Sequence, residues 1–134
     1  FNGDFEPSGG FIPSIFSSFD TPGEVKTVFS FENTILAGLS KSNGCHIQFI
    51  DEDGSLLNHH MIAQGYSVYG IHFDNNILAL ACGHDGILLY SWDGFSLPTF
   101  LGRISTSYAN KIKVNNNRVF TATEDGIDIF KIER

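Results

Sequence analysis

The sequence predicts an all-β protein built from repeats, and three observations point to this class. A short phrase recurs about every 42 residues, Asn-Gly or Asp-Gly pairs separate short apolar runs, and the 134 residues include 13 Phe but only 1 Met. Aromatic residues favour strands, and Asn-Gly and Asp-Gly pairs are strong signals of hairpin turns. Apolar residues are spread along the whole length, so we expect one folded domain rather than a disordered chain.

The repeat is clearest at the turn between the first two strands of each unit. Phe31-Glu-Asn-Thr-Ile-Leu-Ala37 matches Phe73-Asp-Asn-Asn-Ile-Leu-Ala79 at five of seven positions, with an offset of 42 residues. A third copy begins at Val114, 41 residues after Phe73. In each copy an apolar strand enters an Asn-rich turn and a second apolar strand leaves it. Asn suits this turn because it tolerates positive φ and bonds its own backbone.

A second turn follows in each copy, at Asn43-Gly44, Asp85-Gly86 and Asp125-Gly126, where we expect positive φ at both residues of a type I′ turn. A third apolar strand comes next in every copy, over residues 46–50, 87–92 and 127–132. In the first two copies a further Asp-Gly turn leads to a fourth strand, over residues 56–63 and 97–104. Each complete unit is therefore predicted to be a meander of four antiparallel strands.

A single four-stranded meander cannot bury both of its faces, whereas sheets stacked face to face around an axis do bury them. This is the construction of a β-propeller blade. We therefore predict one domain over residues 1–134 with about three blades, formed by residues 21–65, residues 66–107 and, as a partial blade, residues 108–134.

The N-terminal region resembles a fourth strand that has lost its own blade. Ile12-Pro-Ser-Ile-Phe16 is similar to Leu97-Pro-Thr-Phe-Leu101 in the fourth strand of the middle unit. Proline is tolerated there because a fourth strand forms the outer edge of a blade. We expect residues 11–20 to act as a latch strand that completes the blade begun by the C-terminal three strands.

Three blades are too few to close a ring, since propellers typically have at least four. Two kinds of partner are therefore possible. The chain either associates with itself by strand exchange, as a homodimer or a larger assembly, or packs against further blades of a parent chain. The net charge of −7 and the absence of a Lys/Arg cluster disfavour nucleic acid. No apolar run reaches the roughly 18 residues of a membrane-spanning helix.

The repeats resemble blades of the WD40-like superfamily and are most similar to LVIVD-type repeats. The resemblance rests on Phe73-Asp-Asn-Asn-Ile-Leu-Ala-Leu-Ala81, Asp85-Gly-Ile-Leu-Leu-Tyr90 and Glu124-Asp-Gly-Ile-Asp-Ile-Phe130. True WD40 repeats carry Gly-His before the first strand, whereas Gly83-His84 lies in the second turn, and only Trp92-Asp93 matches their pattern. The resemblance implies a ring-shaped scaffold that is extracellular or at the cell surface and binds through its loops.

Four residues are candidates for ligand binding. Glu24, Tyr66 and Tyr108 recur every 42 residues at the entry to the first strand, which lies innermost in a blade. Two tyrosines and a carboxylate at the channel mouth suit a sugar or peptide, although tyrosine also caps blade edges. Trp92 ends a third strand, where it either packs between blades or stacks on a ligand.

The remaining reactive residues do not form a catalytic or metal-binding pattern. The histidines lack metal-ligand spacing, Asp51-Glu-Asp-Gly54 lacks the later glutamate of a calcium loop, and Cys45 and Cys82 fall in different blades with no histidine partner. We expect no catalytic residue, cofactor or metal. The predicted function is therefore a non-enzymatic binding or scaffold module for a protein or glycan. The alternatives are a structural subunit of a surface assembly or filament and a propeller hydrolase or lactonase domain, which would need clustered carboxylates or a metal.

Overall fold

A computed structural model describes residues 13–133. Within this range every regular element is a strand, and none of it forms a helix capable of crossing a membrane. The strands, in chain order, are β1 (Val25–Phe31), β2 (Thr34–Leu39), β3 (Cys45–Ile50), β4 (Leu56–Ile62), β5 (Gly70–Asp74), β6 (Ile77–Ala81), β7 (Ile87–Ser91), β8 (Thr99–Ile104), β9 (Ala109–Asn115), β10 (Arg118–Thr123) and β11 (Gly126–Lys131).

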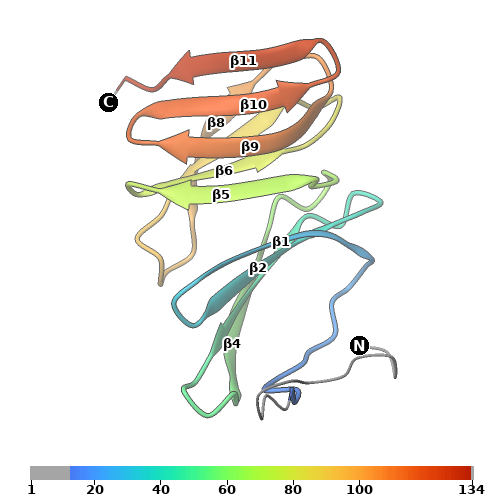
Figure 1. Cartoon of the computed structure of the whole chain (residues 1–134), viewed down its shortest axis with the longest axis vertical. Coiled ribbons are helices and arrows are strands. Elements are labelled where there is room, and N and C mark those ends of the chain that lie inside the picture. Colours follow the sequence, from blue (N-terminus) through green and yellow to red (C-terminus); the bar gives the residue numbers. More distant parts are fainter. Residues whose placement is uncertain (1–12, 134) are drawn as a thin grey trace.

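These strands form three antiparallel meanders, which confirms the predicted all-β fold made of propeller blades. Blade 1 has the strand order β1-β2-β3-β4, blade 2 has the order β5-β6-β7-β8, and blade 3 consists of β9, β10 and β11. The first strand of blade 2, β5, packs against both β1 and β9 (Figure 1). The innermost strands of successive blades are therefore neighbours. No sheet among the described residues closes on itself, so the three blades form an open array.

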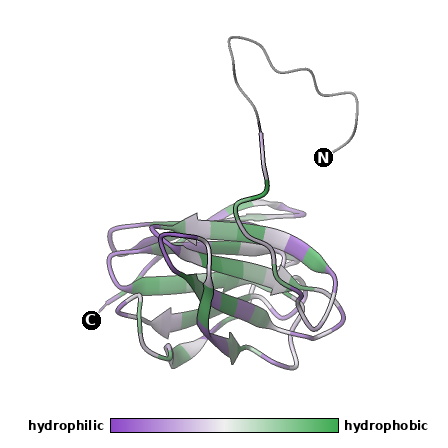
Figure 2. Ribbon diagram, turned by 90° about the horizontal axis from the view of Figure 1, so that it is seen from below, coloured by the Kyte–Doolittle hydropathy of each residue, from purple (hydrophilic) through white to green (hydrophobic). Residues whose placement is uncertain are grey.

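The core lies in two layers between the blades. Between blades 1 and 2 it includes Leu36, Ile47, Leu78, Leu88 and Trp92. Between blades 2 and 3 it includes Ile77, Ala79, Leu89, Val114 and Val119. Every residue of β6 is buried, because blade 2 has a neighbour on each face. Figure 2 shows the hydrophobic stretches along the strands and the hydrophilic ones mainly in the turns.

Blades 2 and 3 are joined by hydrogen bonds between equivalent positions of the repeat. The backbone N–H of Val114 donates to Nδ1 of His72 at 3.0 Å, and that of Asn116 donates to the carboxylate of Asp74 at 3.0 Å. Each pair is separated by 42 residues, the repeat length. The period seen in the sequence is therefore also the geometric step from one blade to the next.

The second turns differ from the predicted type I′ form. In all three Asn-Gly or Asp-Gly pairs only the glycine has positive φ, at 82° for Gly44, 79° for Gly86 and 137° for Gly126. In blades 1 and 2 the reason is that five residues join the second strand to the third, so the pair ends a longer loop. Positive φ at both central residues occurs instead in the first turn of blade 2, at Asn75 (51°) and Asn76 (64°).

The described part of the predicted latch strand, residues 13–20, is not a strand within the single chain. It lies against blade 1, where the Ser17 hydroxyl donates to the Gly54 carbonyl oxygen at 2.7 Å and the Phe19 ring stacks on His46 at 5.4 Å. Residues 11 and 12 lie outside the described range. The strand pairing predicted for this segment requires a second set of strands and stays a prediction.

Candidate binding surface

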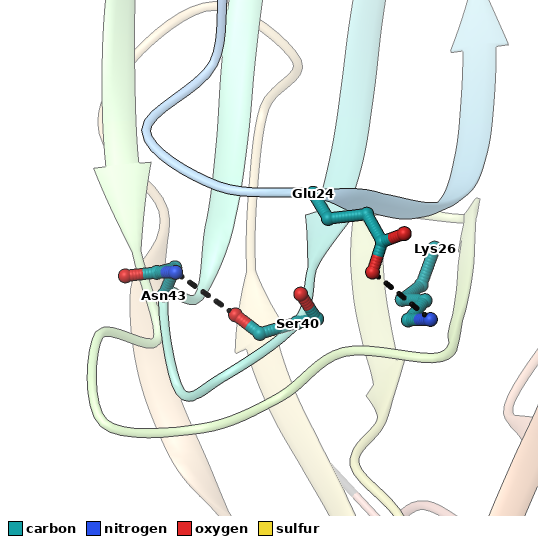
Figure 3. Close-up of polar contacts among 4 residues, drawn as sticks. All are labelled: Glu24, Lys26, Ser40 and Asn43. Atoms are coloured by element: carbon teal, nitrogen blue, oxygen red, sulfur yellow. Dashed lines mark hydrogen bonds and ion pairs between the residues drawn. The ribbon is translucent and has the colours of Figure 1, made fainter.

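The predicted binding residues Glu24, Tyr66 and Tyr108 do not come together as one group. Glu24 is exposed at the start of β1, and its carboxylate pairs with the Lys26 ammonium at 3.1 Å (Figure 3). Its carbonyl oxygen accepts the Ser40 N–H at 3.0 Å, and the Ser40 carbonyl accepts the Asn43 side-chain amide at 3.0 Å. Glu24 therefore helps to hold the loop between β2 and β3.

Tyr66 is half-buried and packs against the core between blades 1 and 2. Its backbone N–H donates to the Ala63 carbonyl at 3.0 Å, and its own carbonyl accepts the Gly44 N–H at 2.9 Å. These bonds tie the connection between the blades to the second turn of blade 1. Tyr66 therefore stands four residues ahead of β5, whereas Tyr108 directly precedes β9.

Trp92 is buried at the junction of blades 1 and 2, with 2% of its surface exposed. Its ring meets Phe73 at 4.8 Å and Phe31 at 5.4 Å, both edge to face, and its indole N–H donates to the Ser96 carbonyl at 2.6 Å. These contacts are those of a side chain that packs between blades rather than one that stacks on a ligand.

The structure instead assembles a group that includes two residues missed in the sequence. Tyr108 lies 5.6 Å from the ring of Tyr69 and 4.7 Å from that of His84, which stands edge to face with it. We call Tyr69, His84 and Tyr108 the tyrosine cluster. A hydrogen bond with Tyr69 raises the pKa of Tyr108, with smaller contributions from lost hydration and from the charges of Tyr69 and Glu124. His84 is exposed and both tyrosines are half-buried.

The two tyrosine rings of the cluster lie close to the backbone of Gly83, which has no side chain to obstruct them. Gly83 has φ of 62°, and a Cβ there would come within 2.9 Å of the Tyr69 ring and 3.0 Å of the Tyr108 ring. Gly83 and Ala109 exchange two backbone hydrogen bonds of 2.8 and 2.9 Å, which join blade 2 to blade 3. The Gly83-His84 pair is the sequence signal that marks this site, although by itself it predicts only a turn.

The histidines of blade 1 pack with aromatic rings. His46 stacks on His59 at 5.0 Å and accepts or donates a hydrogen bond of 3.0 Å with Gln48. His60 meets Phe49 edge to face at 5.7 Å, so His59 and His60 point to opposite faces of β4, as adjacent strand residues do. No three His, Cys, Asp or Glu side chains between residues 13 and 133 are grouped as metal ligands would be.

The two cysteines belong to the same core layer, although the sequence places them in different blades. Both are free thiols, and burial raises the pKa of Cys82 to about 12 and that of Cys45 further still.

In the acidic turn of blade 1, hydrogen bonds from Ser55 lower the pKa of Asp53. Hydrogen bonds from Ser96 and Phe95 do the same for Asp93 in blade 2. These carboxylates brace the turns that contain them.

No protein-family model and no curated protein matches the sequence. Among solved structures, the computationally designed protein Ika4 aligns at 13% identity with a TM-score of 0.54, covering 91% of this chain and all of Ika4. The designed protein Ika8 aligns at 17% identity with a TM-score of 0.61, covering 87% of this chain and 36% of Ika8. Apo AztD from Citrobacter koseri aligns at 10% identity with a TM-score of 0.38, covering 79% of this chain and 34% of AztD.

The alignments with Ika4 and Ika8 support the fold alone, because both identities are far below the level at which function can be compared. This chain spans about a third of the length of Ika8 and of AztD. The resemblance to LVIVD-type repeats stays a prediction.

Proposed function

We propose that this chain is a non-enzymatic binding or scaffold module that recognises a protein or glycan through the tyrosine cluster. The observation that carries the proposal is that three loops place Tyr69, His84 and Tyr108 in contact at one end of the blades. Tyrosine offers a rigid apolar ring and a polar hydroxyl, and His84 adds an exposed imidazole. Loops held by a rigid scaffold are the usual place for binding residues.

The reactive groups support a binding role over catalysis. Both thiols are buried and have raised pKa values, so neither forms the thiolate that a cysteine nucleophile needs. The carboxylates of Asp53 and Asp93 accept hydrogen bonds from their own turns, and Glu24 pairs with Lys26. The resemblance to LVIVD-type repeats supports a location outside the cytoplasm, either secreted or at the cell surface.

The proposal can be tested by screening the 134-residue chain against a glycan array and a displayed peptide library. For any ligand recovered, Tyr108→Ala should weaken binding at least tenfold in titration calorimetry, because the substitution removes one ring and a hydroxyl. Phe95→Ala is the matched control, since Phe95 is 70% exposed in the turn between β7 and β8. Equal affinity of wild type and Tyr108→Ala for every recovered ligand would refute the proposal, as would an array and a library that yield no ligand.

A second candidate function, a structural subunit of an assembly, is favoured by a different observation. Strand β11 has an unpaired edge within the described part of the chain. Free strand edges are sites at which other chains add strands.

A further inference from the structure

Blade 3 has an empty place beside its last strand. In blades 1 and 2 the third strand pairs with a fourth, β4 on β3 and β8 on β7, whereas no strand in residues 13–133 pairs with the outer edge of β11. Just past the end of β11 lies a hollow of about 480 Å³ between Ile132 and blade 2, lined by Leu89, Leu101, Ile104 and Ile132 together with Ser91, Gly102, Arg103 and Glu133. An added strand would therefore find unpaired backbone groups and a hollow with both apolar and polar lining.

A segment of the chain has the sequence for this place. Pro13-Ser-Ile-Phe16 resembles Pro98-Thr-Phe-Leu101, which leads into β8, the fourth strand of blade 2. The side chains of Ile15 and Phe16 are 82% and 61% exposed, an unusual state for large apolar residues in a segment that packs on a sheet. Within residues 13–133 the segment therefore has two apolar side chains that stay mostly exposed.

This segment also lies on the side of blade 1 that faces away from blade 2. The Phe19 ring stacks on His46 of β3. The neighbours of His46 in the strand, Cys45 and Ile47, pack in the core layer shared with blade 2, so His46 points to the opposite face. The Ser17 hydroxyl donates to the Gly54 carbonyl oxygen in the turn before β4. Residues 13–20 therefore contact the side of blade 1 on which a preceding blade would pack.

The outer face of blade 3 is apolar and uncovered. Ile127 and Ile129 are 73% and 61% exposed, although their equivalents in blade 2, Ile87 and Leu89, are buried against blade 3. Phe120 and Ile127 help to line a second hollow of about 240 Å³ on this face. Blade 1 lies at the far end of the molecule (Figure 1). Its Val28 is 63% exposed and alternates in β1 with Phe29 and Phe31, which pack against the core, so Val28 faces the outer side.

The two ends also differ in charge. Residues 108–134 hold five of the eight Lys and Arg residues and four acids, whereas residues 1–65 hold eight of the fifteen acids and only two basic residues. The net charge is thus +1 for residues 108–134 and −6 for residues 1–65. Contact between the first blade of one copy and the last blade of another therefore avoids the repulsion that two acidic first blades would meet.

We propose that two copies of this chain pair head to tail, each placing its residues 13–20 as the fourth strand beside β11 of the other. Blade 3 of one copy then packs on the outer side of blade 1 of the other, and Ile127 and Ile129 become buried as Ile87 and Leu89 are. Two such junctions, related by a twofold rotation, close a ring of six blades. This proposal is independent of the ligand site at the tyrosine cluster.

Sedimentation velocity of the 134-residue chain tests the pairing. We expect a species of twice the 14.8 kDa chain mass that dissociates on dilution. A chain that stays monomeric at all concentrations would overturn the proposal and leave blade 3 to be completed by blades of a longer protein. Open-ended growth into larger species would also overturn it, because the junctions would then build a filament rather than a closed pair.

Point variants test which surfaces meet. Ile15→Asp and Ile129→Lys each place a charge on an exposed side chain, so each should fold normally and weaken pairing at least tenfold. Phe95→Asp is the matched control, because Phe95 is equally exposed but lies outside both surfaces. Fluorescence of the single, buried Trp92 reports whether each variant is folded. Unchanged dimer mass for folded Ile15→Asp and Ile129→Lys would contradict the proposal.

Mixing the two variants gives a sharper test. In a mixed pair, residues 13–20 of the Ile129→Lys chain are unchanged and meet the unchanged β11 of the Ile15→Asp chain. One of the two junctions is therefore the same as in wild type. We therefore expect the mixture to form dimers more strongly than either variant alone. Deletion of residues 1–20 should likewise abolish self-pairing, and a deleted chain that stays folded and dimeric would rule out the latch. Failure of the mixture to regain dimers would show that the two surfaces do not meet.

Discussion

Gly86 shows how a single backbone position fixes the geometry of blade 2. Its φ is 79°, and a Cβ at this position would collide with the carbonyl oxygen of Ile104. Gly86→Val should therefore lose about 3 kcal/mol of unfolding free energy, since β-branched residues resist positive φ and the clash adds strain. Gly102→Val is the control, because Gly102 lies in β8 with open space around it and should change stability by under about 0.5 kcal/mol. Urea unfolding measures both, and equal losses would contradict the prediction.

His72 makes the contact between blades 2 and 3 sensitive to acid. Burial lowers its pKa from 6.5, with a further contribution from Lys113 that Asp74 opposes, and Nδ1 must stay unprotonated to accept the Val114 N–H. A lowered pKa means that the unfolded chain binds this proton more strongly, so folding stability falls as the pH drops below 6.5. Because the ring is half exposed, solvent screening keeps the effect under about 1 kcal/mol.

The test for His72 compares wild type with His72→Asn, whose side-chain oxygen can still accept a hydrogen bond but does not titrate. Between pH 7.5 and pH 5 the wild type should lose more unfolding free energy than the variant, because both share all other titrating groups. Identical pH profiles in urea unfolding would show that His72 does not contribute.

Among the elements, the junction of blades 1 and 2 depends on Trp92. Its ring contacts Phe31 of blade 1 and Phe73 of blade 2, and its indole N–H is bonded to Ser96. Trp92→Ala should lose about 3–5 kcal/mol of unfolding free energy, and Trp92→Phe less, because a ring remains. Far-ultraviolet circular dichroism in urea measures this without relying on the lost fluorophore. Wild-type stability of Trp92→Ala would mean that the ring does not join the blades.

At the scale of the whole molecule, the three blades differ in how many neighbours they have. Among residues 13–133, blade 2 packs against a blade on each face, whereas blades 1 and 3 each pack against one blade only. Hydrogen exchange should therefore be slowest in β6 and fastest in β11 when the chain is dilute, since local opening follows the number of buried contacts. If copies pair as proposed, exchange in β11 should slow as concentration rises. Slower exchange in β11 than in β6 in the dilute chain would contradict this order.

The sequence alone determined the strands and their order, because both depend on local signals. The similar segments that begin at Phe31 and Phe73 revealed the 42-residue period. The Asp-Gly and Asn-Gly pairs placed the strand ends close to their observed positions. It also gave the alternation of His59 and His60, since neighbouring strand residues always point to opposite faces. Turn conformation was less accurate in blades 1 and 2, because the φ angles there depend on the whole five-residue loop rather than on one dipeptide.

Only the tertiary structure decided which loops meet. The 42-residue spacing of Glu24, Tyr66 and Tyr108 suggested one ring of side chains, yet Tyr108 contacts Tyr69 and His84 instead. The repeat places equivalent positions one blade apart, but their contacts depend on how each residue is held. His72 bonds to its equivalent, Val114, in the next blade, whereas Tyr66 packs into the core. Cys45 and Cys82 share a core layer because blades 1 and 2 pack face to face. Sequence periodicity specifies each blade, and the packing of one blade on the next specifies the site.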